Sequence, residues 1–488
     1  MNLEPLRPIV EKLPVVKAPL VQPTLNERLF YTGIILVIFF LMYHIYPVGV
    51  VIGQDSTMEF LQLVLASKIG SLITIGIGPI VLASIFLQLF VGAKIIDIDL
   101  SQPRNKGLFQ GTQKLLAILL AFFEAYIYTN LMTLDPVFGD TGTRIIVAIQ
   151  VALGSIILLY FDEVISKYGI GSGIGLFIAG GVSLAVVSGI VGILLGFGGI
   201  PQANTLIFHL LEGGANAIPS AIIALAPLVA TVLVLAASVY AEGIKVEIPL
   251  AFEKARGFGG RFPIKFLYTS NMPVILAFAF LSSVQLFGHV VEGVDFDLGG
   301  VDFASFIAVY DPTGRLMGGL LYLISPSFPS PIAISGGMPV YINLMLTSSQ
   351  TLLVPFVGAV LVPEYVHAII YAITLSLLSI LFGYLWTETS GMTARDVAGQ
   401  LRNSGLSIPG FRRDPRMVEK ILSKYIPVIT VLGSGFVGLL AAFADLTGAI
   451  GTGTGILLTA GILYRIYEEM ESRKMFDMYP ALRGMLGG

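Results

Sequence analysis

Apolar runs long enough to cross a lipid bilayer restrict the fold of this chain more than any other feature. A helix that spans the hydrocarbon core needs roughly 20 apolar residues. Only 12% of the 488 residues are charged and 55% are hydrophobic, whereas a soluble domain carries about 25% charged residues. The sequence therefore predicts an all-α polytopic membrane protein with ten transmembrane helices. The spanning runs are 29–47, 72–91, 115–134, 144–161, 174–196, 219–240, 266–289, 362–386, 426–443 and 449–467.

The basic residues support this set of spans. If the chain starts on side one, all of the 28 Lys and Arg residues fall on that side except Lys68, Arg144 and Arg315. Cytoplasmic loops carry the excess of Lys and Arg in membrane proteins. We therefore expect a multi-pass protein of the cell membrane with both termini in the cytoplasm.

An internal repeat divides the spans into two halves. The run Gly171–Ile178 (GSGIGLFI) aligns with Gly451–Leu458 (GTGTGILL), and in this topology the two runs enter the membrane from opposite sides. Inverted halves place a functional site at their interface near the bilayer midplane. Glycine and serine or threonine at this spacing also serve close helix packing alone, so the repeat leaves that alternative open.

The halves define the expected domain organisation. We expect a large folded loop at 290–361, because five prolines interrupt its apolar runs. The other predicted parts are a cytoplasmic interfacial segment (1–28), the first half (29–200), an external connection (201–218), the second half (219–467) with basic cytoplasmic loops 241–265 and 387–424, and a cytoplasmic tail (468–488).

The apolar stretch 56–92 is divided into two pieces. Ser56 and Glu59 form a capping-box pattern that starts a helix, but this helix is too short for a hydrocarbon core of roughly 30 Å. The second piece holds two glycines and a proline, and non-helical backbone at membrane depth must be covered by protein or line a cavity. We predict a re-entrant plug half-helix at 56–67 beside a pore-lining helix. The alternative is an interfacial segment followed by a kinked packing helix.

Residues that could carry catalysis or bind a metal are sparse. The chain has no cysteine, and no carboxylate accompanies its histidines at a metal-binding spacing. We interpret Asp162–Glu163, at the end of a span, as a solvated turn. We expect no enzyme activity, metal site or cofactor. The four histidines, which we place at interfaces or in loops, are His44, His209, His289 and His367.

The middle of the spans offers one charge and several aliphatic side chains. Glu124 lies well inside a span, where an ionisable group is a functional candidate, and a hydrogen bond to a neighbouring helix is the alternative. A ring of aliphatic side chains can close a wide path by dewetting, although ordinary core packing would use the same residues. The aliphatic candidates are Ile77, Val81, Ile174, Ile178 and Leu458.

Seven segments spread along the chain carry a family signature. They are KIGSLITIGIGPIVLASIFLQLFVG (68–92), LFQGTQKLL (108–116), YFDEVISKYGIGSGIGLFIA (160–179), YAEGIKVEIPLAF (240–252), FPIKFLYTSNMPVIL (262–276), LRNSGLSIPGFR (401–412) and GAIGTGTGILLT (448–459). In order and spacing they resemble the SecY family, the large subunit of the protein-conducting channel. The resemblance covers nearly the whole chain and is closest to the archaeal members, which are related to the eukaryotic translocon alpha subunit.

The resemblance implies a clamshell of two inverted halves around an hourglass pore. It implies a pore ring of the five aliphatic candidates together with Ile275, and an external plug at 56–67 that includes Ser56, Glu59, Leu61 and Leu65. A lateral gate would open between spans two and three on one side and spans seven and eight on the other. The gate positions would be Leu82, Glu124 and Ser283.

The resemblance also implies partners and a function. The channel would pass unfolded secretory chains across the membrane and release transmembrane segments sideways into lipid. Expected partners are a SecE-type (gamma) subunit, a Sec-beta-type subunit, the ribosome, signal sequences and nascent chains, and membrane lipids. Ribosomal RNA is a polyanion, so basic residues suit docking. The implied docking residues are Lys254, Arg256, Arg261, Arg412 and Arg413.

The chain departs from the family pattern at several positions. Some relatives carry an arginine cluster where this chain has Lys245-Val246-Glu247, which puts the contribution of loop 241–265 to docking in doubt. Leu82 and Ser283 stand where relatives often carry threonine and asparagine, so we expect a changed hydrophobicity threshold for gate opening. A secondary transporter with inverted repeats is the rival function, and it requires polar groups at the midplane.

Overall fold

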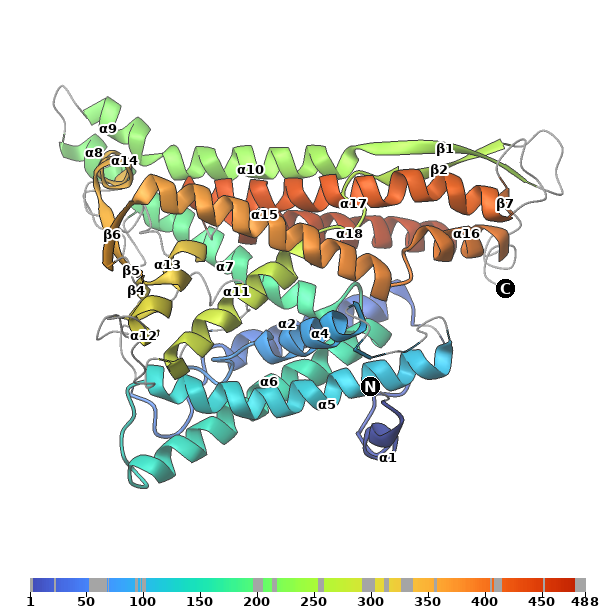
Figure 1. Ribbon diagram of the computed structural model, residues 1–488, viewed down its shortest axis with the longest axis horizontal. Coiled ribbons are helices and arrows are strands. Elements are labelled where there is room, and N and C mark those ends of the chain that lie inside the picture. Colours follow the sequence, from blue (N-terminus) through green and yellow to red (C-terminus); the bar gives the residue numbers. More distant parts are fainter. Residues whose placement is uncertain are drawn as a thin grey trace.

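The helices of this protein lie side by side in one bundle. Figure 1 shows the long helices running roughly along one direction, with the connections gathered at two ends. We call the end that holds β1 (Lys245–Phe252) the hairpin end, and the opposite end, with β5 (Ser349–Val354), the loop end. The computed structural model describes residues 3–21, 23–51, 68, 70–92, 95–96, 98, 102–195, 205–212, 217–252, 259–291, 303–310, 316–325, 337–354, 358–403, 406–407, 415–450 and 453–478.

The first half of the chain contributes five long helices. Thr24 and Glu27 form a capping box at the start of the first of them, with the Thr24 hydroxyl accepting from the Glu27 amide. The elements are η1 (Glu4–Leu6), α1 (Arg7–Val10), α2 (Leu25–Met42), α4 (Gly78–Gly92), α5 (Pro103–Tyr128), η2 (Thr129–Leu131), α6 (Asp140–Tyr168) and α7 (Gly173–Leu195).

The second half repeats this pattern with more elaborate connections. The span predicted at 219–240 is broken at Leu225, because Pro227, the second residue of the next helix, has no N–H to continue the previous one. The helices are α8 (Leu206–Glu212), α9 (Ala217–Ala224), α10 (Ala226–Gly243), α11 (Met272–Val291), α15 (Glu364–Thr389), α16 (Ala394–Asn403), α17 (Pro415–Leu446) and α18 (Gly453–Met478).

Two predicted spans begin later than the sequence suggested. Helix α4 starts at Gly78 rather than at residue 72, and α11 starts at Met272 rather than at residue 266. In the turns before α4 the hydroxyl of Thr74 donates to the carbonyl oxygen of Ser71 at 2.6 Å, and Gly76 has a φ of 50°. Side-chain bonds of this kind compete with helical ones. The result is irregular backbone deep in the bundle, covered by protein.

Seven described helices are long and apolar enough to cross a membrane by length and composition, namely α2, α5, α6, α7, α10, α15 and α17. The apolar helices α4 and α11 are shorter because turns replace their predicted beginnings. Helix α18 continues to Met478, beyond the predicted end of the last span at residue 467. The first part of the predicted tail 468–488 is therefore helical. The protein is a polytopic, all-helical membrane protein.

The two basic loops meet in one small sheet at the hairpin end. Strand β1 pairs antiparallel with β2 (Gly259–Lys265), and β7 (Leu406–Ser407) from the second loop adds to the other edge of β1. The hydroxyl of Tyr268 donates to the carbonyl oxygen of Met392 at 2.8 Å. Burial, helped by Asp396, raises the pKa of Tyr268 to about 12. This hydroxyl therefore remains a donor at any physiological pH.

The described parts of the loop 290–361 form short helices and strands, and they cover the loop end of α11 and α15. Helix α13 packs against both of these helices. Tyr310 extends the contact, since its hydroxyl donates to the carbonyl oxygen of Gln285 on α11 at 2.8 Å. The elements are α12 (Phe303–Ile307), β3 (Val309–Tyr310), β4 (Leu316–Gly318), α13 (Leu320–Ile324), α14 (Gly337–Thr347), β5, and β6 (Gly358–Pro363).

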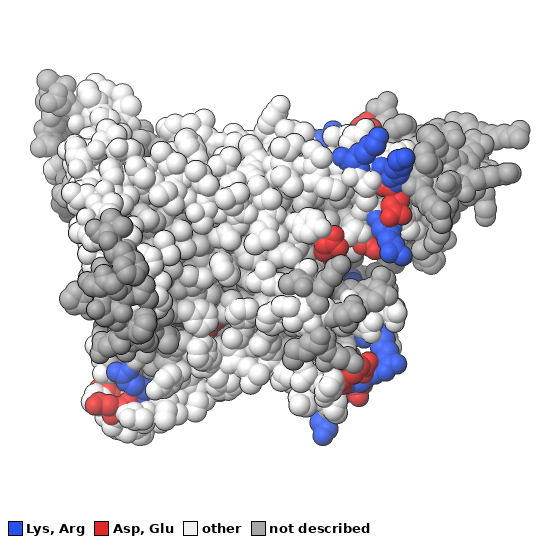
Figure 2. All heavy atoms as spheres, viewed as in Figure 1, with Lys and Arg blue, Asp and Glu red and all other residues white. Residues whose placement is uncertain are grey.

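One apolar core joins the two halves, and apolar side chains also cover the outside. The rings of Phe39 and Phe177 stack in this core with centroids 5.0 Å apart. On the outside, Val187 and Leu377 are well exposed. Figure 2 shows that Lys, Arg, Asp and Glu gather at the two ends on this face, with a wide, almost uncharged band between them. Such a band fits the hydrocarbon core of a bilayer.

Candidate functional site

The six aliphatic residues expected in the ring come together in the core. Five are buried in one cluster, and Ile174 packs against it while partly buried. They come from both halves of the chain: Ile77 and Val81 from the turn before α4 and from α4, Ile174 and Ile178 from α7, Ile275 from α11, and Leu458 from α18.

A buried asparagine fixes the start of α11 against α18. The Asn271 amide nitrogen donates to the carbonyl oxygens of Leu457 and Leu458 at 3.3 and 3.4 Å. Gly461 permits this approach, because a Cβ at that position would overlap the Asn271 side chain. These contacts fix the residue that precedes α11, the helix of Ile275, against the part of α18 that holds Leu458.

The interpretation of Asp162 and Glu163 as a solvated turn is wrong, because α6 continues past both residues to Tyr168. The Asp162 carboxylate accepts from the Ile174 amide at 3.0 Å and so caps the start of α7. Gly173 allows the close approach, since a Cβ there would lie 2.5 Å from the Asp162 backbone. This cap holds Ile174, one of the residues expected in the ring, in place.

The two walls of the expected lateral gate are in contact. Helix α4 packs against α11 and α15, and Leu82 on α4 is buried. Between α5 and α11 the rings of Phe123 and Phe287 lie with centroids 5.9 Å apart. The Ser283 hydroxyl donates to the carbonyl oxygen of Ala279 on its own helix at 2.8 Å. This seam between the halves is built from apolar contacts.

A family model described as SecY matches residues 71–467. The chain belongs to the SecY family. It is 39% identical over 490 residues to the protein translocase subunit SecY of Methanocaldococcus jannaschii, with 99% of this chain and 100% of that protein covered. It is 40% identical over 491 residues to the subunit of the same name from Methanothermobacter thermautotrophicus, with 99% of each chain covered.

Solved structures agree with this SecY membership. "The structure of a protein conducting channel" superposes with a TM-score of 0.77 at 38% identity, covering 98% of this chain and 99% of that one. Sec61 in the canine ribosome–channel complex superposes with a TM-score of 0.74 at 37% identity, with the same coverage. The resemblance inferred from the sequence is therefore confirmed, and so is the all-helical polytopic fold.

Several residues singled out in this SecY chain lie outside the described residues. They are the plug positions Ser56, Glu59, Leu61 and Leu65 and the docking positions Lys254, Arg256, Arg412 and Arg413. Of the docking set only Arg261 is described, in β2 opposite Pro249 of β1. These assignments stay predictions.

Glu124 is buried on α5, as expected from its place in the span. Among the described residues nothing forms a hydrogen bond with its Oε1 atom. A buried carboxyl oxygen without a donor is costly. Its role at the gate stays a prediction.

His367 is neither interfacial nor in a loop, contrary to the sequence-based expectation. It is 1% exposed on α15, where Nδ1 lies 3.0 Å from Glu364 Oε2 and Nε2 lies 3.0 Å from the Ser325 carbonyl oxygen. The Tyr322 hydroxyl donates to Glu364 Oε1 at 2.6 Å. Because a carbonyl only accepts, Nε2 carries a proton. The spacing Glu364-x-x-His367 at the start of a span was the signal that could have revealed this cluster.

Proposed function

We propose that this chain is the central subunit of a protein translocation channel. The observation that carries the proposal is the meeting of six aliphatic residues from both inverted halves, in a member of the SecY family. The relatives are protein translocase subunits by name. The clients are unfolded secretory polypeptides and transmembrane segments, and the chain performs no bond chemistry of its own.

The ring is the constriction through which a client passes. Aliphatic side chains bind neither ions nor polar backbone strongly, so they close around a chain of any sequence and dewet when it leaves. Serine in place of Ile77, Val81 and Ile178 is expected to raise the resting ion conductance measured in planar bilayers. The exposed Val187→Ser is the matched control on α7. Unchanged conductance in the triple variant would remove the ring assignment.

The lateral gate is the seam between α4 with α5 and α11 with α15. A hydrophobic segment leaves the pore there because transfer from water to lipid is favourable. Leu82, Glu124 and Ser283 lie on these helices. The plug at 56–67 precedes the turns that lead into α4, and its short predicted length supports a re-entrant position beneath the ring.

The hairpin end is the cytoplasmic face and docks the ribosome. The two basic loops join where β7 pairs with β1. Arg261 lies in β2 of this sheet, and β7 of the same sheet leads to Arg412 and Arg413 in the sequence. One structural relative is a ribosome–channel complex. Arg412→Glu is expected to weaken cosedimentation with ribosomes, most at low salt, because phosphate contacts dominate such binding. Arg144→Glu, at the opposite end of the bundle, is the control, and equal cosedimentation of both variants would contradict the docking assignment.

SecE-type and Sec-beta-type subunits complete the assembly, and the cell membrane is its location. The asymmetry of Lys and Arg supports cytoplasmic N- and C-termini. Membrane lipids receive the segments that leave through the gate.

Crosslinking tests the proposal directly. The chain has no cysteine, so single cysteines at Ile77, Ile178 and Leu458 can be crosslinked to one cysteine in a stalled secretory chain on ribosomes. We expect crosslinks at all three positions and none at a cysteine placed at Val187, which faces outward from α7. Crosslinks confined to the loops would contradict passage through the ring and reopen the transporter alternative.

A further inference from the structure

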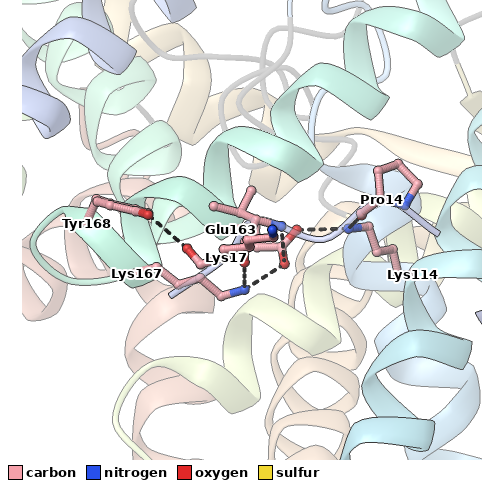
Figure 3. Close-up of polar contacts among 7 residues, drawn as sticks. Pro14, Lys17, Lys114, Glu163, Lys167 and Tyr168 are labelled. Atoms are coloured by element: carbon pink, nitrogen blue, oxygen red, sulfur yellow. Dashed lines mark hydrogen bonds and ion pairs between the residues drawn. The ribbon is translucent and has the colours of Figure 1, made fainter. Parts of the chain in front are cut away.

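The segment between α1 and α2 crosses α5 and the hairpin end of α6. Residues 14–19 contain neither helix nor strand. Figure 3 shows part of this segment beside Lys114 of α5 and Glu163, Lys167 and Tyr168 of α6.

Among the described residues, the hydrogen bonds from these side chains to the segment all reach main-chain atoms. Lys114 Nζ donates to the Pro14 carbonyl oxygen at 2.6 Å, and Lys167 Nζ donates to that of Val16. The Tyr168 hydroxyl donates to the Lys17 carbonyl oxygen at 2.9 Å. In the other direction, the Val16 amide donates to Glu163 Oε1 at 3.2 Å. Three carbonyl groups and one amide group of the segment are thus bound, and main-chain groups of this kind are what a site binds when it holds a peptide through its backbone.

The side chains of the segment take little part in this contact. Val15 is 60% exposed, and Pro14 and Lys17 are exposed as well. A site that binds backbone and leaves side chains in solvent accepts many sequences.

Three of the four binding side chains hold one another in position. Glu163 forms ion pairs with Lys114 at 2.8 Å and with Lys167 at 2.9 Å. Lys114 Nζ also lies 4.2 Å from the ring centroid of Tyr160. The Glu163 carboxylate therefore orients both lysines before any chain binds. The site combines two positive charges with one negative, and the carbonyl oxygens of a bound chain supply the remaining acceptors.

We propose that Lys114, Glu163, Lys167 and Tyr168 form a docking site for an extended polypeptide, and that residues 14–17 occupy it until a client chain takes their place. The inference rests on the proposed function, since the incoming partner is an unfolded client. Helix α5 packs against α4, which carries Val81 and Leu82. A client held at this site would lie next to the helices through which it enters the pore.

Photocrosslinking with the unaltered channel tests this proposal. A stalled secretory chain carries a diazirine amino acid in the polar stretch beside its signal sequence, and crosslinked channel peptides are identified by mass spectrometry. We expect crosslinks to peptides that contain Lys114 or residues 160–168, besides crosslinks to the ring. Crosslinks to the ring with no crosslinks to these two kinds of peptide would overturn the docking site but would not contradict the channel function. Absence of ring crosslinks would contradict the channel function itself.

Limited digestion with trypsin is the second measurement. Trypsin can cut after Lys12 and after Lys17, and the two sites are comparable because a proline stands two residues after each lysine. The Lys17 carbonyl is bound by Tyr168, whereas Lys12 lies in the turn after α1. Tyr168→Phe is expected to speed cleavage after Lys17 by about threefold to tenfold, the effect of one hydrogen bond. The exposed Val15→Ser should leave that rate unchanged.

Engagement of the stalled client should speed cleavage after Lys17 in the unaltered channel and leave cleavage after Lys12 unchanged. An unchanged rate at Lys17 in a sample with ring crosslinks would show that residues 14–17 are a permanent strap and would overturn the proposal.

Discussion

The two halves of this protein meet along two seams of different construction. At the seam between α7 and α18 a glycine permits a close contact, since a Cβ at Gly189 of α7 would overlap the side chain of Ile450, which lies just before α18. The Gly171 amide also donates to Glu469 Oε2 at 3.0 Å. Small residues that let helices approach, together with a hydrogen bond, are what hold helices together in a membrane.

The opposite seam, where α4 meets α11 and α15, is built from larger apolar side chains. Leu82 and the pair Phe123–Phe287 lie there, and the Ser283 hydroxyl is bonded within its own helix. Lipid tails can replace such contacts at low cost, because they are as apolar as the side chains. From this difference we expect the α7–α18 seam to stay closed and the α4 seam to be the side that opens.

The wall formed by α11 and α15 is braced from the loop end. Helix α13 contacts both helices, and the cluster of Tyr322, Glu364 and His367 ties it to α15. This bracing predicts that α11 and α15 move together when the α4 seam opens.

The largest expected effect is at the fixed seam. Gly189→Leu would force α7 away from Ile450 and should lower the free energy of unfolding by about 3 kcal/mol, as overpacking does in a close-packed site. Thermal unfolding in nanodiscs measures the loss. Gly33→Leu on α2 is the control, because nothing lies within 4 Å of a Cβ there. Equal stability of the two variants would remove the distinction between the seams.

The next effect is at the brace. His367→Leu leaves the buried Glu364 without its imidazole partner and should cost about 2 kcal/mol, within the range for an unsatisfied buried group. Tyr322→Phe should cost less, about 1 kcal/mol, because it removes one hydrogen bond. A double-mutant cycle by chemical unfolding would give a coupling energy. Strict additivity would show that the two side chains do not act as one cluster.

A smaller effect is expected at the α4 seam. Phe287→Ala removes a ring contact worth about 1 kcal/mol, and the loss should favour the open gate. Insertion of a weakly hydrophobic segment into vesicles should therefore increase. The same change at the partly buried Phe86, whose ring stacks on Phe90 of the same helix, serves as the reference for ring removal on α4. An insertion yield that stays constant for Phe287→Ala would place the opening elsewhere.

The smallest effect is predicted for Ser283→Ala. Its hydroxyl bonds only along α11 among the contacts described, so stability should change by less than about 0.5 kcal/mol, as for a substitution away from special features. A large drop in stability would mean that the seam depends on a polar contact and is not purely apolar.

Local patterns in the sequence predicted much of the fold. Apolar length located the helices, and the two aligned glycine motifs lie at the starts of α7 and α18, which begin at the corresponding residues Gly173 and Gly453. The starts of α4 and α11 were predicted too early, because apolar residues such as Ile73 and Leu267 are buried in turns there as they would be in a helix. Hydropathy reports burial and cannot separate these two conformations.

Contacts between segments that are distant along the chain could not be predicted from the sequence. No local pattern indicates that β7 would join β1, that Asp162 would cap α7, or that Lys114 and Glu163 would bind the main chain of the N-terminal segment. Main-chain contacts leave no trace in the identity of the bound residues. His367 was misplaced for a related reason, since its partner Ser325 is 42 residues away and acts through its carbonyl group.

By itself the sequence determined the membrane class, the helical content, the inverted halves and the family, because each depends on composition, length or motifs along one segment. Only the tertiary structure decided which seam is tight, which charges are paired and which backbone is held. These properties depend on distances between helices, and those distances are set by the packing of the whole bundle rather than by any single stretch of residues.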